Sequence, residues 1–356
     1  MFHCAILLYL ASSRSMCEIN LKLQLALGVK YYINFHVMFF SLSSFIIREG
    51  GKYMNDLDII DELHLPSFMK EHFNFSDIEQ KNLYHYTDIY GLEGILKHKE
   101  FWVSSANFLN DKTEIKYTLE LCRELIIEIC ERKQIDDSQP MFLFEFFVKS
   151  HLEETDYYLL SFCTNPDSNL LWSNYSNNDG YNISFQFPEI AFDFYREDSE
   201  YPLVAHVIYD KKKQKEILKG IIERFISLSK FFDPYKFSEL DQLLHEGQGK
   251  ELFVRLSTII TAINISSLFF KDVCFSQEEE FRIAISRESY SCRISNGTFI
   301  PYITARFEKE SVTGITIGPK NNMDITMEGL IQFLKLHEYN HIMKDDIRKS
   351  CIPYRY

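Results

Sequence analysis

The junction between an apolar run and a helical pattern at residues 83–96 constrains this chain most. Leu83-Tyr84-His85-Tyr86 is short, apolar and aromatic, which is typical of a strand. Thr87-Asp88 can cap a helix, and apolar residues then recur at helical spacing from Ile89 to Leu96. We therefore expect His85 and Thr87 where a strand ends and a helix begins. Backbone N–H groups at a helix start favour anions, so His85 either binds a sugar or phosphate there or only stabilises the turn.

Short strand patterns and longer helical patterns continue along the rest of the chain. Strands are expected at 101–104, 157–162, 181–187, 203–209, 280–287, 291–295, 298–304 and 313–317, and a closing strand at 340–349. Helices are expected at 112–133, 139–151 and 327–339, with helical periodicity from 211 to 270. These patterns predict an α+β fold, with a mixed, mainly antiparallel sheet core, flanking helices and a helical insertion at 211–270. Residues 83–356 would form this single domain, preceded by an N-terminal helical arm at 54–82.

Residues 1–53 differ in composition from the rest. The run from Tyr31 to Ile47 has no formal charge, but its 17 residues are few for a membrane span and several are polar. A signal peptide also fits poorly, because a basic end, an apolar core and a cleavage site do not follow in order. Arg48-Glu49-Gly50-Gly51, shortly before Met54, is what a purine-rich ribosome-binding site gives when it is translated in frame. We therefore expect Met54 to be the true start and residues 1–53 to be a leader outside the fold.

Charge and cysteine usage narrow the class of protein. The net charge is −13 and no Lys/Arg tract stands out, which argues against a broad surface for duplex nucleic acid but allows a pocket for one nucleotide. The eight cysteines are scattered without a Cys-x-x-Cys pair, which favours reduced cysteines in a cytoplasmic protein. The phosphate-binding, dinucleotide-binding and serine-nucleophile motifs of G-x-x-x-x-G-K-[ST], G-x-G-x-x-G and G-x-S-x-G type are missing from the sequence.

The segment Phe275–Ile285 carries the most concentrated ionisable groups. If it is a strand, Glu278, Glu280 and Arg282 share one face and apolar side chains share the other. Carboxylates placed in this way can stabilise a cationic transition state, with Arg282 keeping one of them ionised. The alternative is a solvated edge strand with an ion pair.

Two further motifs carry weaker chemistry. Trp172 and Tyr175 could stack on a flat ring, although Trp172 could equally belong to the core. His337-Glu338-Tyr339-Asn340-His341 formally matches the zinc-protease pattern H-E-x-x-H. We interpret it as a chance match, since a helix is expected to end near Tyr339-Asn340 and leave His341 off the face of His337. No metal is therefore expected.

In order along the chain, several segments together resemble a large family of bacterial proteins, a domain of unknown function common near phage-defence genes. The resemblance covers residues 83 to the C-terminus. Its main segments are Tyr84-His85-Tyr86-Thr87, Phe101-Trp102-Val103, Phe108-Leu109-Asn110-Asp111 with Glu114, Leu171-Trp172-Ser173-Asn174-Tyr175 with Gly180, Glu278-Glu279-Glu280-Phe281-Arg282, Ile317-Gly318-Pro319 and Ile352-Pro353-Tyr354-Arg355.

More distantly, the chain resembles the ADP-ribosyltransferase superfamily. There a strand histidine holds the ribose of NAD, an aromatic ring stacks on nicotinamide and a strand glutamate completes the site. The resemblance assigns these roles to His85, to Tyr175 or Trp172, and to Glu280 or Glu278. We further expect NAD, which would be a substrate, to be contacted by Tyr86, Thr87, Asn110, Asp111 and Arg282.

The function implied is a cytoplasmic toxin or anti-phage effector that uses NAD to modify nucleic acid or protein. An antitoxin or another defence protein would be its partner, and no membrane is expected. Two alternatives remain open at this point. The same pocket could serve a nucleotide-binding sensor or partner-docking protein without turnover, or the chain could be a metal-dependent nuclease that uses Glu278, Glu280 and Asp111.

Overall fold

The chain divides into two compact units, Met1–Tyr53 and Met54–Tyr356. The computed structural model describes only residues of the second unit, which are 68, 72–73, 82–108, 113–148, 157–176, 179–187, 189–198, 202–230, 248–287, 289–295, 297–321 and 323–353. The predictions for residues 1–53, for almost all of the arm at 54–82, and for Asn110 and Asp111 therefore lie outside the described residues.

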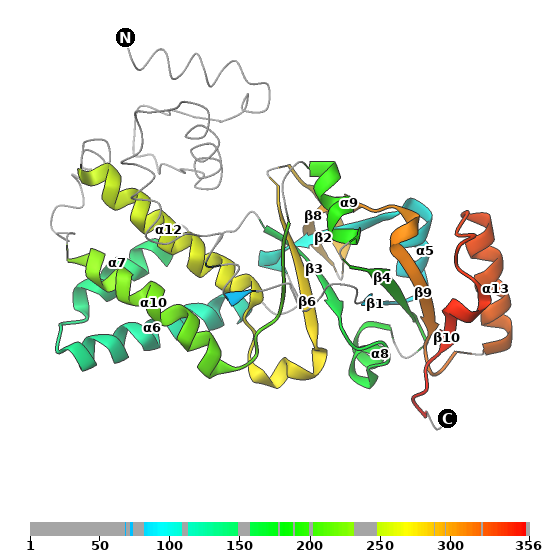
Figure 1. Ribbon diagram of the computed structural model, residues 1–356, viewed down its shortest axis with the longest axis horizontal. Coiled ribbons are helices and arrows are strands. Elements are labelled where there is room, and N and C mark those ends of the chain that lie inside the picture. Colours follow the sequence, from blue (N-terminus) through cyan, green and yellow to red (C-terminus); the bar gives the residue numbers. More distant parts are fainter. Residues whose placement is uncertain are drawn as a thin grey trace, which may run out of the picture. The chain divides into compact units, whose positions relative to one another are not determined.

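Strands of the described residues form one mixed sheet of ten (Figure 1). All their pairings are antiparallel except that of β9 with β10. The order is β10-β9-β4-β1-β3-β2-β8-β7, and β6 pairs with both β3 and β5. The strands are β1 (Asn82–Thr87), β2 (Glu100–Ser105), β3 (Tyr157–Cys163), β4 (Tyr181–Gln186), β5 (Leu203–His206), β6 (Glu280–Ser286), β7 (Ser291–Ser295), β8 (Thr298–Arg306), β9 (Val312–Ile317) and β10 (Ile347–Lys349).

Helices flank this sheet and form a separate helical layer. They are α5 (Ile89–His98), α6 (Thr113–Lys133), α7 (Ser138–Phe147), α8 (Asn169–Ser176), α9 (Glu189–Asp198), α10 (Lys211–Ser229), α12 (Gln248–Phe269) and α13 (Met323–Leu336). Short 3-10 helices are η3 (Ala106–Phe108), η6 (Val273–Glu278), η7 (Lys309–Ser311) and η8 (Lys344–Asp346). The predicted α+β class with a mainly antiparallel sheet is confirmed, and α10 and α12 occupy the predicted helical insertion.

The first core lies between α6, α7, α10 and α12 and one face of the sheet near β3, β5 and β6 (Figure 1). Apolar residues at helical spacing in α10, from Ile217 to Ile226, are buried there. Asp210 caps the start of α10: its carboxylate accepts a hydrogen bond from the Lys212 N–H at 2.8 Å. The helical pattern of the insertion therefore becomes packing against the sheet.

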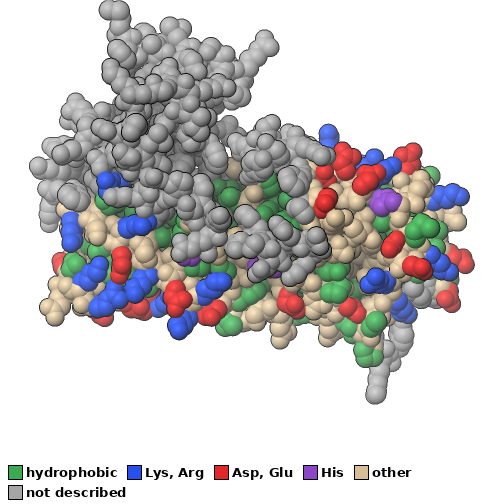
Figure 2. Space-filling model, viewed as in Figure 1, with side chains coloured by type: hydrophobic (Ala, Val, Ile, Leu, Met, Phe, Trp, Pro, Cys, Tyr) green, Lys and Arg blue, Asp and Glu red, His purple; other side chains and the backbone are tan. Residues whose placement is uncertain are grey.

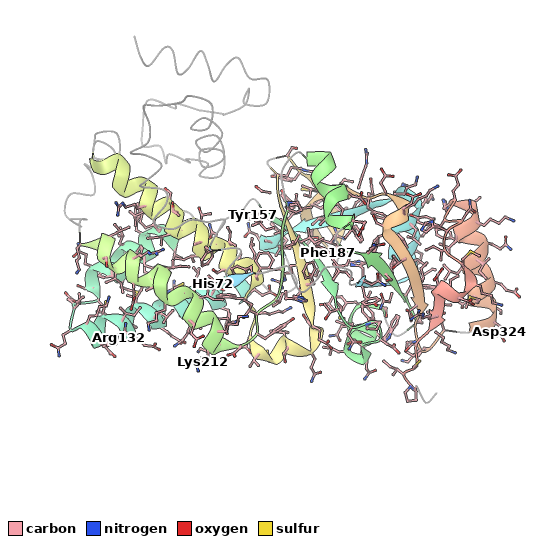
Figure 3. The ribbon with its side chains drawn as sticks, viewed as in Figure 1. His72, Arg132, Tyr157, Phe187, Lys212 and Asp324 are labelled. Atoms are coloured by element: carbon pink, nitrogen blue, oxygen red, sulfur yellow. The ribbon has the colours of Figure 1, made fainter. Side chains whose placement is uncertain are left out.

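Apart from Glu114, the charged side chains of α6 and α10 face outward or lie at the edge of the helical layer. Lys and Arg side chains are interspersed with acidic ones on the face drawn in Figure 2, and Lys211 and Lys215 form ion pairs with Glu124. Arg132 and Lys212 lie on the outer surface of the helical layer (Figure 3). No helix of the described residues is both long and apolar enough to cross a membrane.

The second core covers the opposite face of the sheet. Buried residues of α5, α9 and α13, such as Leu96, Phe194 and Leu334, pack there against strand residues that include Phe101 and Phe281. Asp88 begins α5, as expected, and its side chain accepts from the Gly91 N–H at 2.7 Å. Helix α9 was not anticipated, and the expected strand at 340–349 is reduced to β10 after η8.

The sheet opens between β1 and β2, and this opening positions the site described below. Strand β3 pairs with β6 from Tyr157 to Cys163. On its other edge, β1 pairs only with Cys163, and β2 only with Tyr158 and Leu159. Ser161 thus has no strand partner on that edge. Its carbonyl oxygen instead accepts a hydrogen bond from His85 Nδ1 at 3.2 Å, so a side chain satisfies the exposed backbone group.

Candidate functional site

A cavity of about 900 Å³ occupies the opening between β1 and β2. Its volume lies within the roughly 300–1,000 Å³ that is usual for small-molecule sites. Five residues singled out in the sequence line it together with Tyr86: His85, Tyr175, Glu278, Glu280 and Arg282. Residues that are far apart in the chain thus meet around one space.

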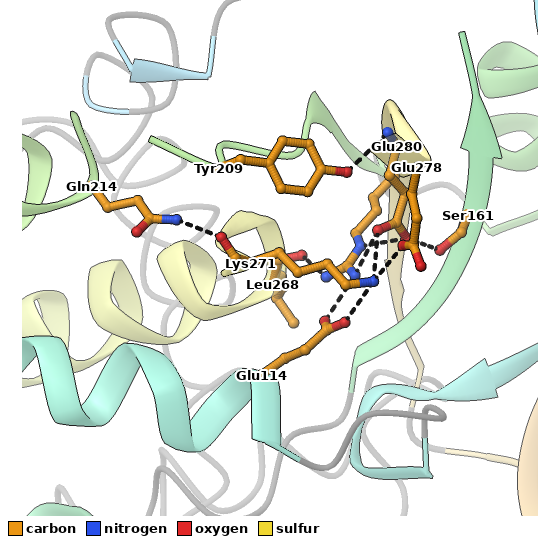
Figure 4. A network of polar contacts seen from close by, with 9 residues as sticks. Glu114, Ser161, Tyr209, Gln214, Leu268, Lys271, Glu278 and Glu280 are labelled. Carbon is orange, nitrogen blue, oxygen red and sulfur yellow. Dashed lines mark hydrogen bonds and ion pairs between the residues drawn. The ribbon is translucent and has the colours of Figure 1, made fainter. Parts of the chain in front are cut away.

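Five charged side chains form a buried cluster on one side of this cavity (Figure 4). Glu114 comes from the first turn of α6, Lys271 follows the end of α12, and Glu278 ends η6. Glu280 and Arg282 lie on β6. None of these side chains is more than 11% exposed.

Lys271 joins the three carboxylates of this cluster. Its Nζ lies 2.6 Å from Glu278 Oε2, 3.1 Å from Glu114 Oε1 and 3.4 Å from Glu280 Oε2. Lys271 is held at its own backbone too, because its carbonyl oxygen accepts a hydrogen bond from Gln214 Nε2 at 2.9 Å. The ammonium group is therefore fixed at the centre of the acids.

Arg282 binds Glu280 through two parallel hydrogen bonds. Its Nε lies 2.8 Å from Glu280 Oε1 and its Nη2 2.9 Å from Glu280 Oε2. Nη1 donates to the carbonyl oxygen of Leu268 at 2.7 Å, and Nη2 also lies 2.8 Å from Glu114 Oε2. This two-pronged geometry is the strongest form of carboxylate binding by arginine.

Strand β3 and the segment after β5 also hold Glu280. The Ser161 hydroxyl donates to Glu280 Oε1, and the Glu280 N–H donates to the Tyr209 hydroxyl at 3.0 Å. Burial would raise the pKa of Glu280, but the charges of Arg282 and Lys271 and the hydrogen bonds from Arg282 and Ser161 lower it to about 2. Glu280 is therefore ionised at neutral pH.

Glu278 differs electrostatically from Glu280. Burial raises its pKa, and the hydrogen bond and charge of Lys271 only partly offset this effect. Three carboxylates face two cationic groups, so the cluster carries one excess negative charge when all are ionised. Glu278 is the carboxylate best suited to take up a proton there.

The structure corrects the sequence-based geometry of this segment. Glu278 is not on the strand, because η6 continues to Glu278 and Glu279 adopts a left-handed backbone with φ 45° before β6 begins. The alternative of a solvated edge strand is also wrong, since β6 lies between β3 and β5 and buries Glu280 and Arg282. The ion pairs of Lys271 with Glu278 and Glu280 nevertheless place Glu278 beside the residues of β6.

His85 lies at the opening itself. Burial lowers its pKa to about 4, so the imidazole is neutral at pH 7. Since Nδ1–H must donate to the Ser161 carbonyl oxygen, Nε2 is left unprotonated and can accept a hydrogen bond. The rings of Phe101 and Phe162 lie edge-on to the imidazole at centroid distances of 5.2 and 5.9 Å. His85 is thus a held acceptor.

Of the two candidate stacking residues, the structure brings only Tyr175 to the cavity. Tyr175 is 43% exposed on α8, and burial raises its pKa to about 12, so its hydroxyl stays protonated. Trp172 is fully buried, donates from Nε1 to Asp167 Oδ1 at 2.7 Å and packs edge-on against Tyr86 at 4.8 Å. The core interpretation of Trp172 is therefore the correct one.

Tyr86 and Thr87 are engaged within the protein. Tyr86 lines the cavity, but its hydroxyl donates to the Asn165 carbonyl oxygen and accepts from the Ser168 N–H, both at 2.8 Å. Thr87 is not among the lining residues and packs beside Gly91, where an added Cβ would lie 1.9 Å from Thr87 Oγ1.

The H-E-x-x-H segment does not form a helical metal site. Helix α13 ends at Leu336, Glu338 has φ 63°, and His341 Nε2 lies 3.0 Å from the Val312 carbonyl oxygen. His337 instead packs against the ring of Phe333. In the described parts of the chain, no group of three or more His, Cys, Asp or Glu side chains could hold a metal ion.

Sequence reasoning missed three contributors to the cluster: the roles of Ser161, Lys271 and Glu114. A signal for Lys271 existed, because it ends a run without charge from Leu256 to Phe270 and stands a few residues before the glutamates. A lysine that directly follows a long apolar run is a candidate for burial against a carboxylate. Glu114 belongs to one of the segments that carry the family resemblance, but nothing in its acid-rich helix indicated a role in the cluster.

Comparison with known proteins gives one match. A family model described as "Protein of unknown function (DUF2971)" matches residues 171–283. Neither the curated proteins nor the solved structures contain a match to this chain. The matched segment includes Tyr175, Lys271 and the cluster residues of η6 and β6, whereas His85 and Glu114 precede it. Residues 171–283 are thus similar to a domain of unknown function, as the sequence predicted.

Proposed function

We propose that the cavity binds NAD and that the protein is a transferase that breaks the bond between nicotinamide and ribose. One observation carries this proposal: His85, Tyr175, Glu278 and Glu280 line a single cavity although they come from distant parts of the chain. The distant resemblance to ADP-ribosyltransferases assigns these residues to the same ligand.

The charge of the cluster suits the reaction. When the C1′–N bond breaks, its electron pair leaves with nicotinamide, whose ring becomes neutral, and C1′ acquires oxocarbenium character. A buried cluster with one excess negative charge stabilises a developing cation, because the interaction is weakly screened away from water. Glu280 supplies a permanently ionised carboxylate and Arg282 fixes its orientation.

His85 and Tyr175 would position the substrate. The unprotonated Nε2 of His85 can accept a hydrogen bond from a ribose hydroxyl, and the half-exposed ring of Tyr175 offers a face for nicotinamide. The imidazole of His85 is held by its hydrogen bond to Ser161, so it loses little freedom on binding.

Glu278 would serve the acceptor. A nucleophile on the acceptor forms the new bond to C1′ and loses a proton, which the Glu278 carboxylate takes up. Its raised pKa makes it a better proton acceptor than Glu280. The acceptor would be a nucleic acid or a protein, and the biological role would be that of a toxin or anti-phage effector controlled by an antitoxin or defence partner.

A second function is favoured by the occupancy of Glu280. Both of its oxygens already bind Arg282, and Lys271 and Ser161 contact them too. A carboxylate neutralised to this extent suits a nucleotide-binding sensor that does not turn over its ligand. The two functions differ in whether NAD is consumed.

Nicotinamide release from NAD by the purified protein tests the proposal. Under the transferase function, the wild type releases nicotinamide, and Glu278→Gln lowers the rate by about 10²-fold or more, which is the usual worth of a general base. Glu124→Gln, which removes a carboxylate from a surface ion pair, is the matched control and keeps the wild-type rate. A melting curve of each variant separates loss of activity from loss of fold.

The alternatives give different results. NAD that raises the melting temperature without nicotinamide release supports the sensor. If NAD does not stabilise the protein and no nicotinamide is released, both functions are contradicted. Metal-dependent cleavage of DNA or RNA with NAD untouched supports a nuclease instead.

A further inference from the structure

A second wall of the same cavity has a chemistry that the proposed reaction does not use. Trp102 on β2 is 54% exposed and lines the cavity. Its ring lies beside that of Tyr302 on β8, with centroids 4.9 Å apart and planes inclined by 33°. Trp102 Nε1 donates to Glu100 Oε1 at 3.1 Å, which holds the indole in place. Trp102, exposed at the cavity wall and backed by the Tyr302 ring, is a platform for a flat ring.

Strand pairing places this platform on the same face of the sheet as the charged cluster. Ser104 lies opposite both Tyr302 and Leu159, while Ser161 lies opposite Arg282. Since alternate residues of a strand share a face, Trp102 and Tyr302 point to the side of Ser161 and Glu280. Strand β3 separates β2 from β6, which sets them about 10 Å apart.

Arg293 on β7 adds a cation to this wall. It also lines the cavity, and its Nη2 donates to the Ser104 hydroxyl at 3.0 Å. Its Nε is buried and has no hydrogen-bond partner among the described residues. A guanidinium at a cavity wall suits a phosphate, whose oxygens can accept hydrogen bonds from its accessible N–H groups.

Across the cavity, helix α5 leaves space. Gly94 lines the cavity, and a Cβ added there would meet no atom within 4 Å. The cavity therefore has open space beside Gly94.

We propose that Trp102, Tyr302 and Arg293 form a nucleotide subsite, in which a base stacks on the indole of Trp102 and its phosphate binds Arg293. The subsite rests on the proposed function only because the two share one cavity. The reacting bond would lie at the charged cluster around Glu280, and the nucleotide would lie at the wall formed by Trp102. The nucleotide has two sources, the ADP half of NAD or one unit of an acceptor nucleic acid.

Binding of ADP and of a single-stranded tetranucleotide, each measured separately by calorimetry, tests the subsite. Trp102→Ala and Arg293→Gln should each lower the affinity for the ligand about tenfold. Trp102→Phe should retain most of the affinity because it keeps a stacking ring. Two matched controls should bind as the wild type does. Phe299→Ala removes an exposed ring from the other face of β8, and Arg132→Gln removes an exposed arginine of α6 that does not line the cavity.

Fluorescence gives an independent readout. The chain has two tryptophans, and Trp172 is fully buried whereas Trp102 is exposed. Quenching of tryptophan emission on ligand addition should therefore disappear in Trp102→Ala and persist in Phe299→Ala.

Each outcome decides the proposal. Weakened ADP binding identifies the dinucleotide as the source, and weakened oligonucleotide binding without ADP binding identifies the acceptor. A wild type that binds neither ligand, or variants that bind both as tightly as the wild type, overturns the subsite. If ADP binds but nicotinamide is not released, only the transferase function is contradicted. If nicotinamide is released at the same rate in Trp102→Ala and Arg293→Gln, and ADP does not bind, only the subsite is contradicted.

Discussion

His85 and Glu280 are hydrogen-bonded to the same residue, Ser161, one through its carbonyl oxygen and the other through its hydroxyl. The imidazole occupies the edge of β3 that no strand covers, and the carboxylate comes from the strand on the opposite edge. One residue of β3 therefore sets the positions of both groups, and any shift of β3 would move them together.

Replacing Ser161 with alanine separates these two links. The Ser161→Ala variant keeps the carbonyl bond to His85 but loses the hydroxyl bond to Glu280. We expect a loss of about 1–3 kcal/mol in the free energy of unfolding, the usual cost of a buried hydrogen bond to a charged group. Urea denaturation measures it. Ser227→Ala, which removes a surface hydroxyl bonded within α10, should change the stability by less.

Lys271→Met should destabilise the protein strongly, because three buried carboxylates would then face only Arg282. Breaking a buried ion pair in this way costs about 3–5 kcal/mol. The penalty should be smaller at pH 5 than at pH 8, since protonation of Glu278, whose pKa burial raises, removes part of the repulsion. Thermal melts at both pH values measure this, and an equal penalty at both would contradict the assignment of Glu278.

The burial of neutral His85 should make the free energy of unfolding sensitive to acid. Its pKa is about 4 in the folded chain and 6.5 in the unfolded one, so the unfolded state binds the extra proton first. The contribution of neutral His85 is fully present above pH 6.5 and is lost as the pH falls toward 4. His85→Asn, which cannot take up a proton, should therefore lose less stability than the wild type between these pH values. Unfolding free energies measured across that interval compare the two proteins, and parallel curves would rule the prediction out.

Filling the space beside Gly94 should block the cavity without harming the fold. Gly94→Leu places a side chain where nothing lies within 4 Å of the new Cβ, in a residue that lines the cavity. Leucine also favours a helix over glycine by about 1 kcal/mol, so the melting temperature should not fall. Binding of NAD and ADP should be lost. Gly220→Leu in α10, which has the same open surroundings but lies outside the cavity, is the control and should keep both ligands.

The local sequence pattern was sufficient to predict an element whose formation depends on side chains only a few residues apart. The run before Asp88 predicted β1 and α5, and the apolar periodicity from Ile217 to Ile226 predicted α10, because each pattern depends on side chains a few residues apart. Helix α9 was missed, since its ten residues follow a strand closely and its burial depends on packing of Phe194 against the sheet.

The amino-acid sequence by itself determined most of the strands and helices and the residue types available for chemistry, because these follow from spacing and side-chain character. Only the tertiary structure decided that Trp172 is core while Tyr175 faces the cavity, and that Lys271 and Glu114 complete the cluster around Glu280. The physical reason is that the opening between β1 and β2 arises from the pairing of both strands with opposite ends of β3. Such pairing depends on hydrogen bonds between distant segments, which no local pattern encodes.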